Sequence, residues 1–450
     1  MMLEKALSQG REKLLAPALF WYGFDLAAGT SWGLMELFCG AWFLCWLPQA
    51  ARELARGSLW PRRRMVQLLW LLLGLYLGWD LWLGVRDGAW GLLWEKYRTV
   101  LPGAGVGGCL WLAGRKNPTV SGPVLRTLGW SGVAAGAAAV LNLTGIGLLP
   151  IYYGRRISLR LDYNVYSTVL LVALLCGSVW LLYRGRRVGA QGALFAWLAP
   201  LLVLSASRRS VLLLIPLAAV LFATAGGLCL SHGEGRRFLA ALGASLVGAC
   251  FVFAALGQFL VFQYDRLLQS GRGELLSPGE GSVFSRYETL TEEWGGSRRA
   301  LIWELCWEQV QQGDTVERWT GQGFGADRLL YRQSRDPRLL SAYTWEEREN
   351  LSAHGFLLAD ALNGGWVQVG LGAALWAGMA AAGWACLRRS WAQGLVLGGG
   401  LGLVLLNNLI SNRFGFLSDR YFWVFAALLW LWSECPRQND PFPRGTGVVQ

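Results

Sequence analysis

One histidine and several arginines near the ends of apolar blocks are the side chains best placed for chemistry. His354 lies a few residues before an apolar block, where a neutral imidazole can take a proton from a hydroxyl group. Arg208 and Arg209 precede a second block, and Arg156 and Arg160 precede a third. Arginine keeps its charge and offers a planar fork of donors that suits phosphate. The pattern predicts a site that binds an anion and moves a proton.

A polar segment rich in tryptophan and arginine lies between these groups. Residues 299–312 place apolar side chains at helical spacing, with Trp303 and Trp307 one turn apart on the same face. These indoles could stack on sugar rings or lie at a membrane interface, and the two interpretations are compatible. The run 321–325 (Gly-Gln-Gly-Phe-Gly) has no surrounding βαβ pattern, so it is not a dinucleotide loop. It is either a flexible turn or, around Gly323, a backbone surface that approaches a phosphate.

The elements that must position these side chains are long apolar blocks. The chain has 450 residues, of which 54% are hydrophobic, and the blocks run for about 15–25 residues, enough to cross a hydrocarbon core about 30 Å thick. They are too long and too uniformly apolar for barrel strands. We therefore expect an all-α, polytopic transmembrane helical bundle of about twelve spans (about 10–14) with one large extracytoplasmic loop containing short helices. The expected spans are 14–28, 30–48, 65–84, 100–114, 127–148, 164–183, 188–206, 210–230, 238–262, 358–387, 391–410 and 420–434.

The basic residues of the short loops predict the orientation. Arginine or lysine groups near residues 52–64, 115–116, 184–187, 236–237 and 388–389 alternate with the spans, which puts both termini in the cytoplasm. The chain then divides into N-terminal helices (1–150), central helices with outward arginine loops (151–262), a large outer loop (263–357), C-terminal helices (358–435) and a cytoplasmic tail (436–450).

The charge distribution narrows the class of ligand. The net charge of +12 does not indicate nucleic acid, because the basic residues lie in short loops between apolar blocks. Arginines on the predicted outer side run against the positive-inside bias. Snorkelling to lipid headgroups explains any single one, but an anionic ligand explains the set better.

Four segments resemble the O-antigen ligase and O-antigen polymerase superfamily of integral-membrane glycan transferases. They are 205–209 (Ser-Ala-Ser-Arg-Arg), 160–164 (Arg-Leu-Asp-Tyr-Asn), Arg299 and Trp303 followed by 321–325, and 352–357 (Ser-Ala-His-Gly-Phe-Leu) followed by 362–365. Their order and spacing match over residues 150–430. The chain departs from the ligase pattern at Gly355 and Gln368, so the resemblance does not separate ligase from polymerase.

The resemblance implies an enzyme of the bacterial cytoplasmic membrane that works at the outer leaflet. It implies a glycan donor linked to undecaprenyl diphosphate, a glycan or lipid acceptor, inversion at the anomeric carbon, and neither metal nor other cofactor. His354, Arg299 and Arg208 are the predicted catalytic residues, with Asp162 and Asp360 as further candidates for the base. The predicted contacts with diphosphate or glycan are Arg209, Arg156, Arg160, Asp162, Asn164, Trp303 and Gly323.

Other functions remain open from the sequence. A polymerase would use the same donor, with a second lipid-linked repeat as acceptor, and a related transferase would use a protein. A membrane transporter is the alternative from another class, although no internal repeat is visible and an outer loop this rich in arginine and tryptophan is unusual for one.

Overall fold

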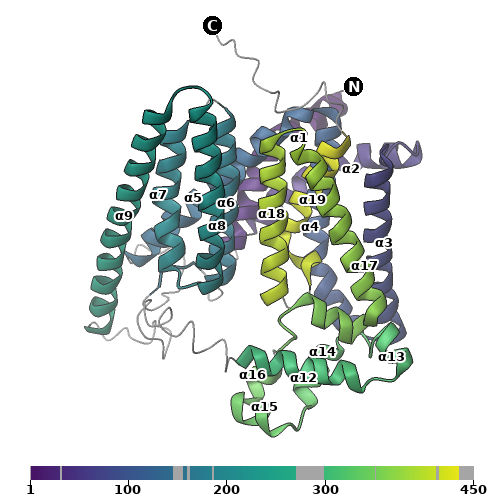
Figure 1. Cartoon of the computed structure of the whole chain (residues 1–450). Helices are drawn as coiled ribbons and strands as arrows, with labels where there is room; N and C mark the ends of the chain where they lie inside the picture. Colours follow the sequence, from purple (N-terminus) through teal and green to yellow (C-terminus); the bar gives the residue numbers. More distant parts are fainter. Residues whose placement is uncertain are drawn as a thin grey trace. The chain divides into compact units, whose positions relative to one another are not determined.

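The structure is a computed structural model that describes residues 2–30, 33–144, 156–159, 163–184, 187–269, 298–349, 351–411 and 415–434. Every regular element in these ranges is helical (Figure 1). The chain divides into two compact units, one of Met1–Leu47 with Thr119–Leu290 (unit 1) and one of Pro48–Pro118 with Thr291–Gln450 (unit 2). Helix α2 (Leu34–Ala55) runs from the first into the second.

Within the described ranges, eight helices are long and apolar enough to cross a membrane: α2, α3 (Arg64–Arg86), α5 (Ser121–Leu143), α6 (Tyr163–Tyr183), α8 (Arg208–Leu230), α9 (Gly235–Gln269), α17 (Phe356–Leu387) and α18 (Trp391–Ser411). The other predicted spans also fall on helices, namely α1 (Met2–Ala28), α4 (Trp90–Lys116), the shorter apolar α7 (Val188–Leu204) and α19 (Arg420–Glu434). The helices indicate a membrane protein, and the all-helical fold class is confirmed. The predicted number of twelve spans is not.

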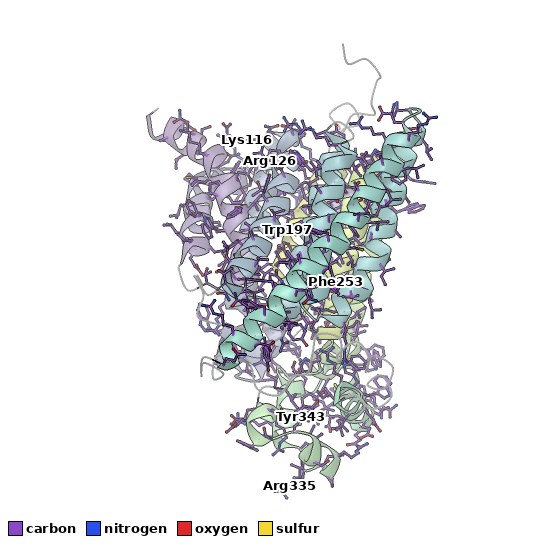
Figure 2. All side chains as sticks on the ribbon, turned by 90° about the vertical axis from the view of Figure 1, so that its left-hand side faces the viewer. Lys116, Arg126, Trp197, Phe253, Arg335 and Tyr343 are labelled. Atoms are coloured by element: carbon purple, nitrogen blue, oxygen red, sulfur yellow. The ribbon has the colours of Figure 1, made fainter. Side chains whose placement is uncertain are left out.

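Unit 1 is packed around α6, whose side chains are buried along almost the whole helix. Small residues let its neighbours come close: a Cβ on Gly129 of α5 would lie 2.9 Å from the Cα of Gly177 on α6. Such close backbone approach is how helices associate in lipid, where burial of apolar surface gives little drive. Figure 2 shows Trp197 of α7 partway along its helix and Arg126 of α5 near one end.

Unit 2 pairs α3 with α17 and α4 with α19. Gly103 and Gly107 of α4 make room for Trp423 of α19, since a Cβ on Gly107 would lie 3.0 Å from the Trp423 carbonyl oxygen. A layer of short helices lies at one end of this unit (Figure 1). These are α12 (Arg298–Gln312), α13 (Thr315–Thr320), α14 (Ala326–Gln333), α15 (Pro337–Ala342) and α16 (Trp345–Glu349). Lys116 lies at the opposite end of the unit from Arg335 and Tyr343 (Figure 2).

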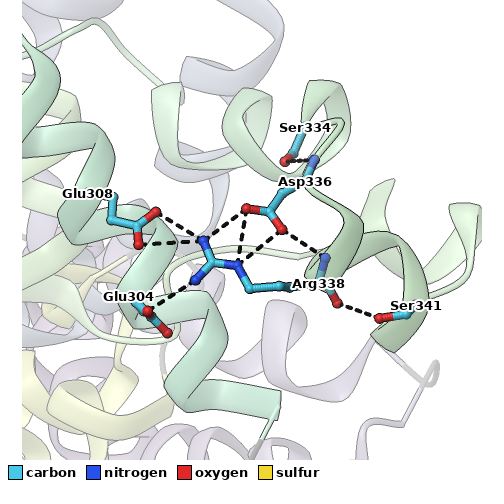
Figure 3. Close-up of polar contacts among 6 residues, drawn as sticks. All are labelled: Glu304, Glu308, Ser334, Asp336, Arg338 and Ser341. Atoms are coloured by element: carbon cyan, nitrogen blue, oxygen red, sulfur yellow. Dashed lines mark hydrogen bonds and ion pairs between the residues drawn. The ribbon is translucent and has the colours of Figure 1, made fainter.

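The sequence pattern of residues 299–312 correctly predicts α12, which ends at Gln312. Asp314 then caps α13 through a reciprocal capping box with Glu317. The apolar face of α12, including Ile302 and Cys306, packs with residues of α14, α15 and α17. On the outer face of α12, Arg338 of α15 contacts Glu304 at 3.0 Å and Glu308 at 3.1 Å (Figure 3). An apolar core thus packs α12 against α14, α15 and α17, and ion pairs join it to α15.

Candidate functional site

The predicted site residues fall into two groups, one in each unit. Unit 1 holds Arg156, Asn164, Arg208 and Arg209, while Arg160 and Asp162 lie outside the described residues. Unit 2 holds Arg299, Trp303, Gly323 and His354. We name residues 205–210 the Arg turn and residues 352–356 the His turn.

The Arg turn links α7 to α8 through a backbone conformation that side chains seldom adopt. Ala206 has φ +59°, in the left-handed region. The following Ser207 is extended, and its hydroxyl accepts a hydrogen bond from the Ser210 N–H, which makes it the N-cap of α8. Arg208 and Arg209 are therefore the first residues of the helix. Their charges lie beside the positive end of its dipole, an arrangement that favours an anion.

Hydrogen bonds between hydroxyl and amide groups hold the Arg turn against α6. The Ser207 Oγ lies 2.8 Å from the Asn164 Oδ1 on α6, and the Ser210 Oγ lies 2.6 Å from the Ser167 Oγ. Ser207 and Ser210 are fully buried. The predicted contact residue Asn164 is thus joined directly to the turn that carries the two arginines.

Arg156 approaches the same end of unit 1 through its neighbours. The Ile157 N–H donates a hydrogen bond of 2.9 Å to the Leu204 carbonyl at the end of α7. The Arg156 guanidinium lies over the ring of Tyr163, 4.4 Å from its centroid. The structure therefore places Arg156, Asn164, Arg208 and Arg209 at one end of unit 1.

The His turn precedes α17 and is the second place where a side-chain-bearing residue has positive φ, here +48° at His354. The preceding residue, Ala353, is held through both of its backbone polar groups. The Trp303 Nε1 donates to the Ala353 carbonyl at 3.0 Å, and the Ala353 N–H donates to the Asp327 Oδ2 at 3.2 Å. Trp303, predicted to stack on sugar, thus also fixes the backbone beside the histidine.

The end of α18 brings Arg299 to the same place. A Cβ on Gly355 would lie 2.8 Å from the Leu409 carbonyl oxygen, so the His turn lies directly against this helix. The next carbonyl, of Ile410, is 3.5 Å from the Arg299 guanidinium. Arg299, Trp303 and His354 therefore meet where α17 begins and α18 ends. Trp307 is directed elsewhere: it is 42% exposed and forms an edge-to-face pair with Trp366.

The glycine-rich run docks on a break in α17, a feature that the sequence analysis did not predict. Gly365 interrupts the helix with φ +64° and ψ −166°. The Gln322 and Gly323 N–H groups donate to the Leu362 and Asn363 carbonyls at 2.8 and 3.2 Å. A Cβ on Gly321 would lie 2.1 Å from the Asn363 oxygen, so the contact requires glycine. The N–H groups of Gln322 and Gly323 thus have protein acceptors, and a substrate role for Gly323 stays a prediction.

A buried polar cluster in unit 2 is the feature that sequence reasoning largely missed. Lys96 of α4 contacts Asp80 of α3 at 2.7 Å. The Tyr76 hydroxyl donates to the Asp360 Oδ2 at 2.7 Å, and the Gln368 Nε2 donates to the Asp360 Oδ1 at 3.1 Å. Of these residues, the sequence pattern predicts a role only for Asp360, as a further candidate for the base. Charged residues inside apolar blocks, such as Asp80, are the signal that could have identified the cluster.

Burial and hydrogen bonds shift the pKa values of Asp327, Cys306 and Asp87. Burial raises the pKa of the Asp327 carboxyl, while its hydrogen bonds from Asn363 and Ala353 act in the opposite direction. Burial also raises the pKa of the Cys306 thiol to about 12, so this cysteine stays protonated and is a poor nucleophile. Burial favours a higher pKa for Asp87 too, but hydrogen bonds from Arg86 and the Phe324 N–H hold it below its ordinary value.

The described residues contain no group of three or more His, Cys, Asp or Glu side chains placed to hold a metal ion. The arrangement places Arg208 and Arg209 at the Arg turn, and it places His354 and Arg299 against the same end of α18 at the His turn. Comparison with models of protein families gives no match, and no curated protein is significantly similar to the chain.

Proposed function

We propose that the chain is a membrane glycosyltransferase of the O-antigen ligase type. It moves a glycan from undecaprenyl diphosphate to an acceptor hydroxyl at the outer face of the bacterial cytoplasmic membrane. In this proposal the twelve helices at the predicted spans cross the membrane, both termini are cytoplasmic, and α12–α16 lie outside. Lys116 and the short helices lie at opposite ends of unit 2, which supports this orientation.

The observation that carries the proposal is the position of two strained residues. Among the described residues, Ala206 and His354 are the two with positive φ that are not glycine. Such conformations cost about 1–3 kcal/mol and concentrate at functional sites. Each lies inside a segment on which the resemblance rests, although backbone conformation played no part in finding that resemblance.

The proposed roles follow from the chemistry of the transfer. As the anomeric C–O bond breaks, charge develops on the diphosphate, and Arg208 and Arg209 supply donors that keep their charge. The acceptor hydroxyl loses its proton as its oxygen forms the new glycosidic bond, and the His354 imidazole takes that proton. Arg299 places a further positive charge beside the His turn. The leaving group is the undecaprenyl diphosphate anion.

Deleting the gene in its own host tests the proposal. The surface polysaccharide is separated on a gel beside the extracted carrier lipids, and the wild-type gene is returned as a control. We expect full-length polymer on the carrier lipid and none on the final acceptor.

The same gel distinguishes the alternatives. Single repeat units on both carrier and acceptor would mean that the enzyme is a polymerase. An unchanged pattern in both pools would contradict glycan transfer and favour a transporter.

A further inference from the structure

The buried polar cluster of unit 2 surrounds a small cavity between α3, α4, α14 and α17. Its polar lining includes Asp80, Lys96, Asp327, Asp360 and Gln368, and Phe324 and Leu92 contribute apolar surface. The cavity has a volume of about 40 Å³. A space of this size admits a few water molecules or one small ion and is too small for a sugar ring.

Charge is unbalanced around this cavity. Three carboxyls, of Asp80, Asp327 and Asp360, face one lysine ammonium, while Arg328 is paired at 2.9 Å with Glu95. Asp80, Asp327 and Asp360 are each at least 96% buried. Burying a carboxylate without a compensating positive charge is costly, so binding a positive charge stabilises the folded chain.

Two acceptor atoms of residues that line the cavity also indicate that a positive charge or a hydrogen-bond donor binds there. The Asp80 Oδ2 and the Gln368 Oε1 have no hydrogen-bond partner among the described residues, although their side chains are 2% and 1% exposed. A buried polar atom without a partner costs about 1–3 kcal/mol. Both atoms are oxygens, so what they lack is a donor or a cation.

We propose that this cavity binds one monovalent cation, either a proton or an alkali-metal ion, at Asp80, Asp360 and Gln368. The break in α17 at Gly365 lies beside Gln368, and broken helices near buried carboxylates are where membrane proteins commonly hold such ions. Among the described residues no three acidic, histidine or cysteine side chains, the three aspartates of this cavity included, are placed to hold one metal ion together. The proposal does not depend on the glycan-transfer function.

The cavity also has a direct link to the His turn. Asp327 lines the cavity, and its Oδ2 accepts the N–H of Ala353, the residue before His354. The Asp327 Oδ1 accepts a hydrogen bond of 3.1 Å from Asn363, next to the break in α17. Occupancy of the cavity therefore acts on the backbone that positions the histidine.

Thermal unfolding of the purified full-length protein in detergent tests the proposal. The 26 tryptophans provide the fluorescence signal. Melting temperatures are measured in sodium, potassium or choline chloride at constant ionic strength, and from pH 5 to pH 9. Choline is too large for the cavity, so it controls for ionic strength.

The two candidate cations, an alkali-metal ion and a proton, predict different melting behaviour. A bound alkali ion raises the melting temperature as sodium or potassium replaces choline, because the ion binds only the folded state. A bound proton is released on unfolding, so the melting temperature falls as pH rises and the choice of salt has no effect.

Two variants assign the effect to this cavity. Gln368→Leu removes an acceptor and should weaken the salt response, whereas Gln191→Leu should leave it unchanged. Gln191 is matched because it is a buried glutamine of α7 whose Oε1 also lacks a partner among the described residues. Asp360→Asn imitates a protonated carboxyl and should flatten the pH dependence.

If the wild-type melting temperature does not respond to alkali ions, and its pH curve runs parallel to that of Asp360→Asn, the proposal is wrong. A salt response that persists in Gln368→Leu would also overturn it. Infrared spectra of the wild type give a reading that does not need folded variants. A band of a protonated carboxyl at neutral pH supports the proton, and its absence together with no salt response excludes both cations.

Discussion

The Arg turn and the His turn are built alike and supported differently. Each places one side-chain-bearing residue at positive φ just before a long apolar helix, α8 or α17. The Arg turn is held by neutral groups, the hydroxyls of Ser207 and Ser210 and the carboxamide of Asn164. The His turn is held by an indole and by the buried carboxyl of Asp327. The backbone of the Arg turn therefore rests on hydroxyl and carboxamide groups, whereas the backbone of the His turn rests in part on a carboxyl, which can exchange a proton.

The largest expected effect comes from removing the imidazole of the His turn. His354→Ala should reduce glycan transfer by about 10²–10⁴-fold, because a general base is lost from the transition state. Transfer is measured by returning the variant gene to the deletion strain. His232→Ala is the matched control, since the chain has two histidines and His232 is exposed in the turn between α8 and α9. Near-wild-type transfer by His354→Ala would remove this residue from the mechanism.

Removing the charges of the Arg turn should have the next largest effect. Replacing Arg208 and Arg209 together by alanine should lower transfer by about 10²–10³-fold, because donors to the developing diphosphate charge are lost. The corresponding lysine variant should recover part of the activity, since lysine keeps the charge without the fork.

Arg236 and Arg237 provide a matched pair near the start of α9, the next helix of unit 1. Their double alanine variant should transfer normally. Equal losses from both pairs would mean that the arginines act through general membrane charge, and the comparison between the two turns would lose its basis.

The sequence predicted α7, α8 and α17, the long helices that adjoin the two turns, because the length of an apolar run and the polar residues that end it are local properties. It also predicted α12 and its end near Gly313. It did not predict which helices meet. Tyr76 bonds to Asp360 and Asp80 lies near Gln368 across nearly 300 residues of chain, at separations of 284 and 288. The break at Gly365 is equally hidden, since glycine is common in apolar helices and only the docked run 321–325 gives it a purpose.

Backbone strain at the Arg turn can be tested without touching a charge. Ala206→Val should lower the free energy of unfolding by about 1–3 kcal/mol, because a β-branched side chain strongly disfavours positive φ. Ala206→Gly should change it by less than about 1 kcal/mol, since relief of strain offsets the added entropy of the unfolded chain. Thermal unfolding in detergent measures both. If the valine variant is as stable as the wild type, Ala206 is not strained.

The ionisation of Asp327, the carboxyl that supports the His turn, should make the stability of the protein depend on pH. Burial raises the pKa of Asp327, so its protonated form is favoured in the folded state. Its contribution to stability is present at pH below about 4 and is lost as pH rises through the raised pKa. Asp327→Asn should therefore flatten part of the fall in melting temperature above about pH 4, while the Arg turn variants keep the wild-type slope. An unchanged slope in Asp327→Asn would assign the titration to another group.

The smallest effect is expected from the ion pairs on the outer face of α12. Arg338 contacts Glu304, Glu308 and Asp336, and its guanidinium and the Asp336 carboxylate hold each other charged (Figure 3). The hydrogen bonds from Arg338 lower the pKa of Asp336. Because these groups face water, solvent and salt screen them. Arg338→Ala should shift the melting temperature slightly at low salt and not at all at high salt, with transfer unchanged. A large loss of transfer would mean that α12 positions Arg299 and Trp303 through these surface pairs, and that the apolar contacts of Ile302 and Cys306 do not suffice to hold it.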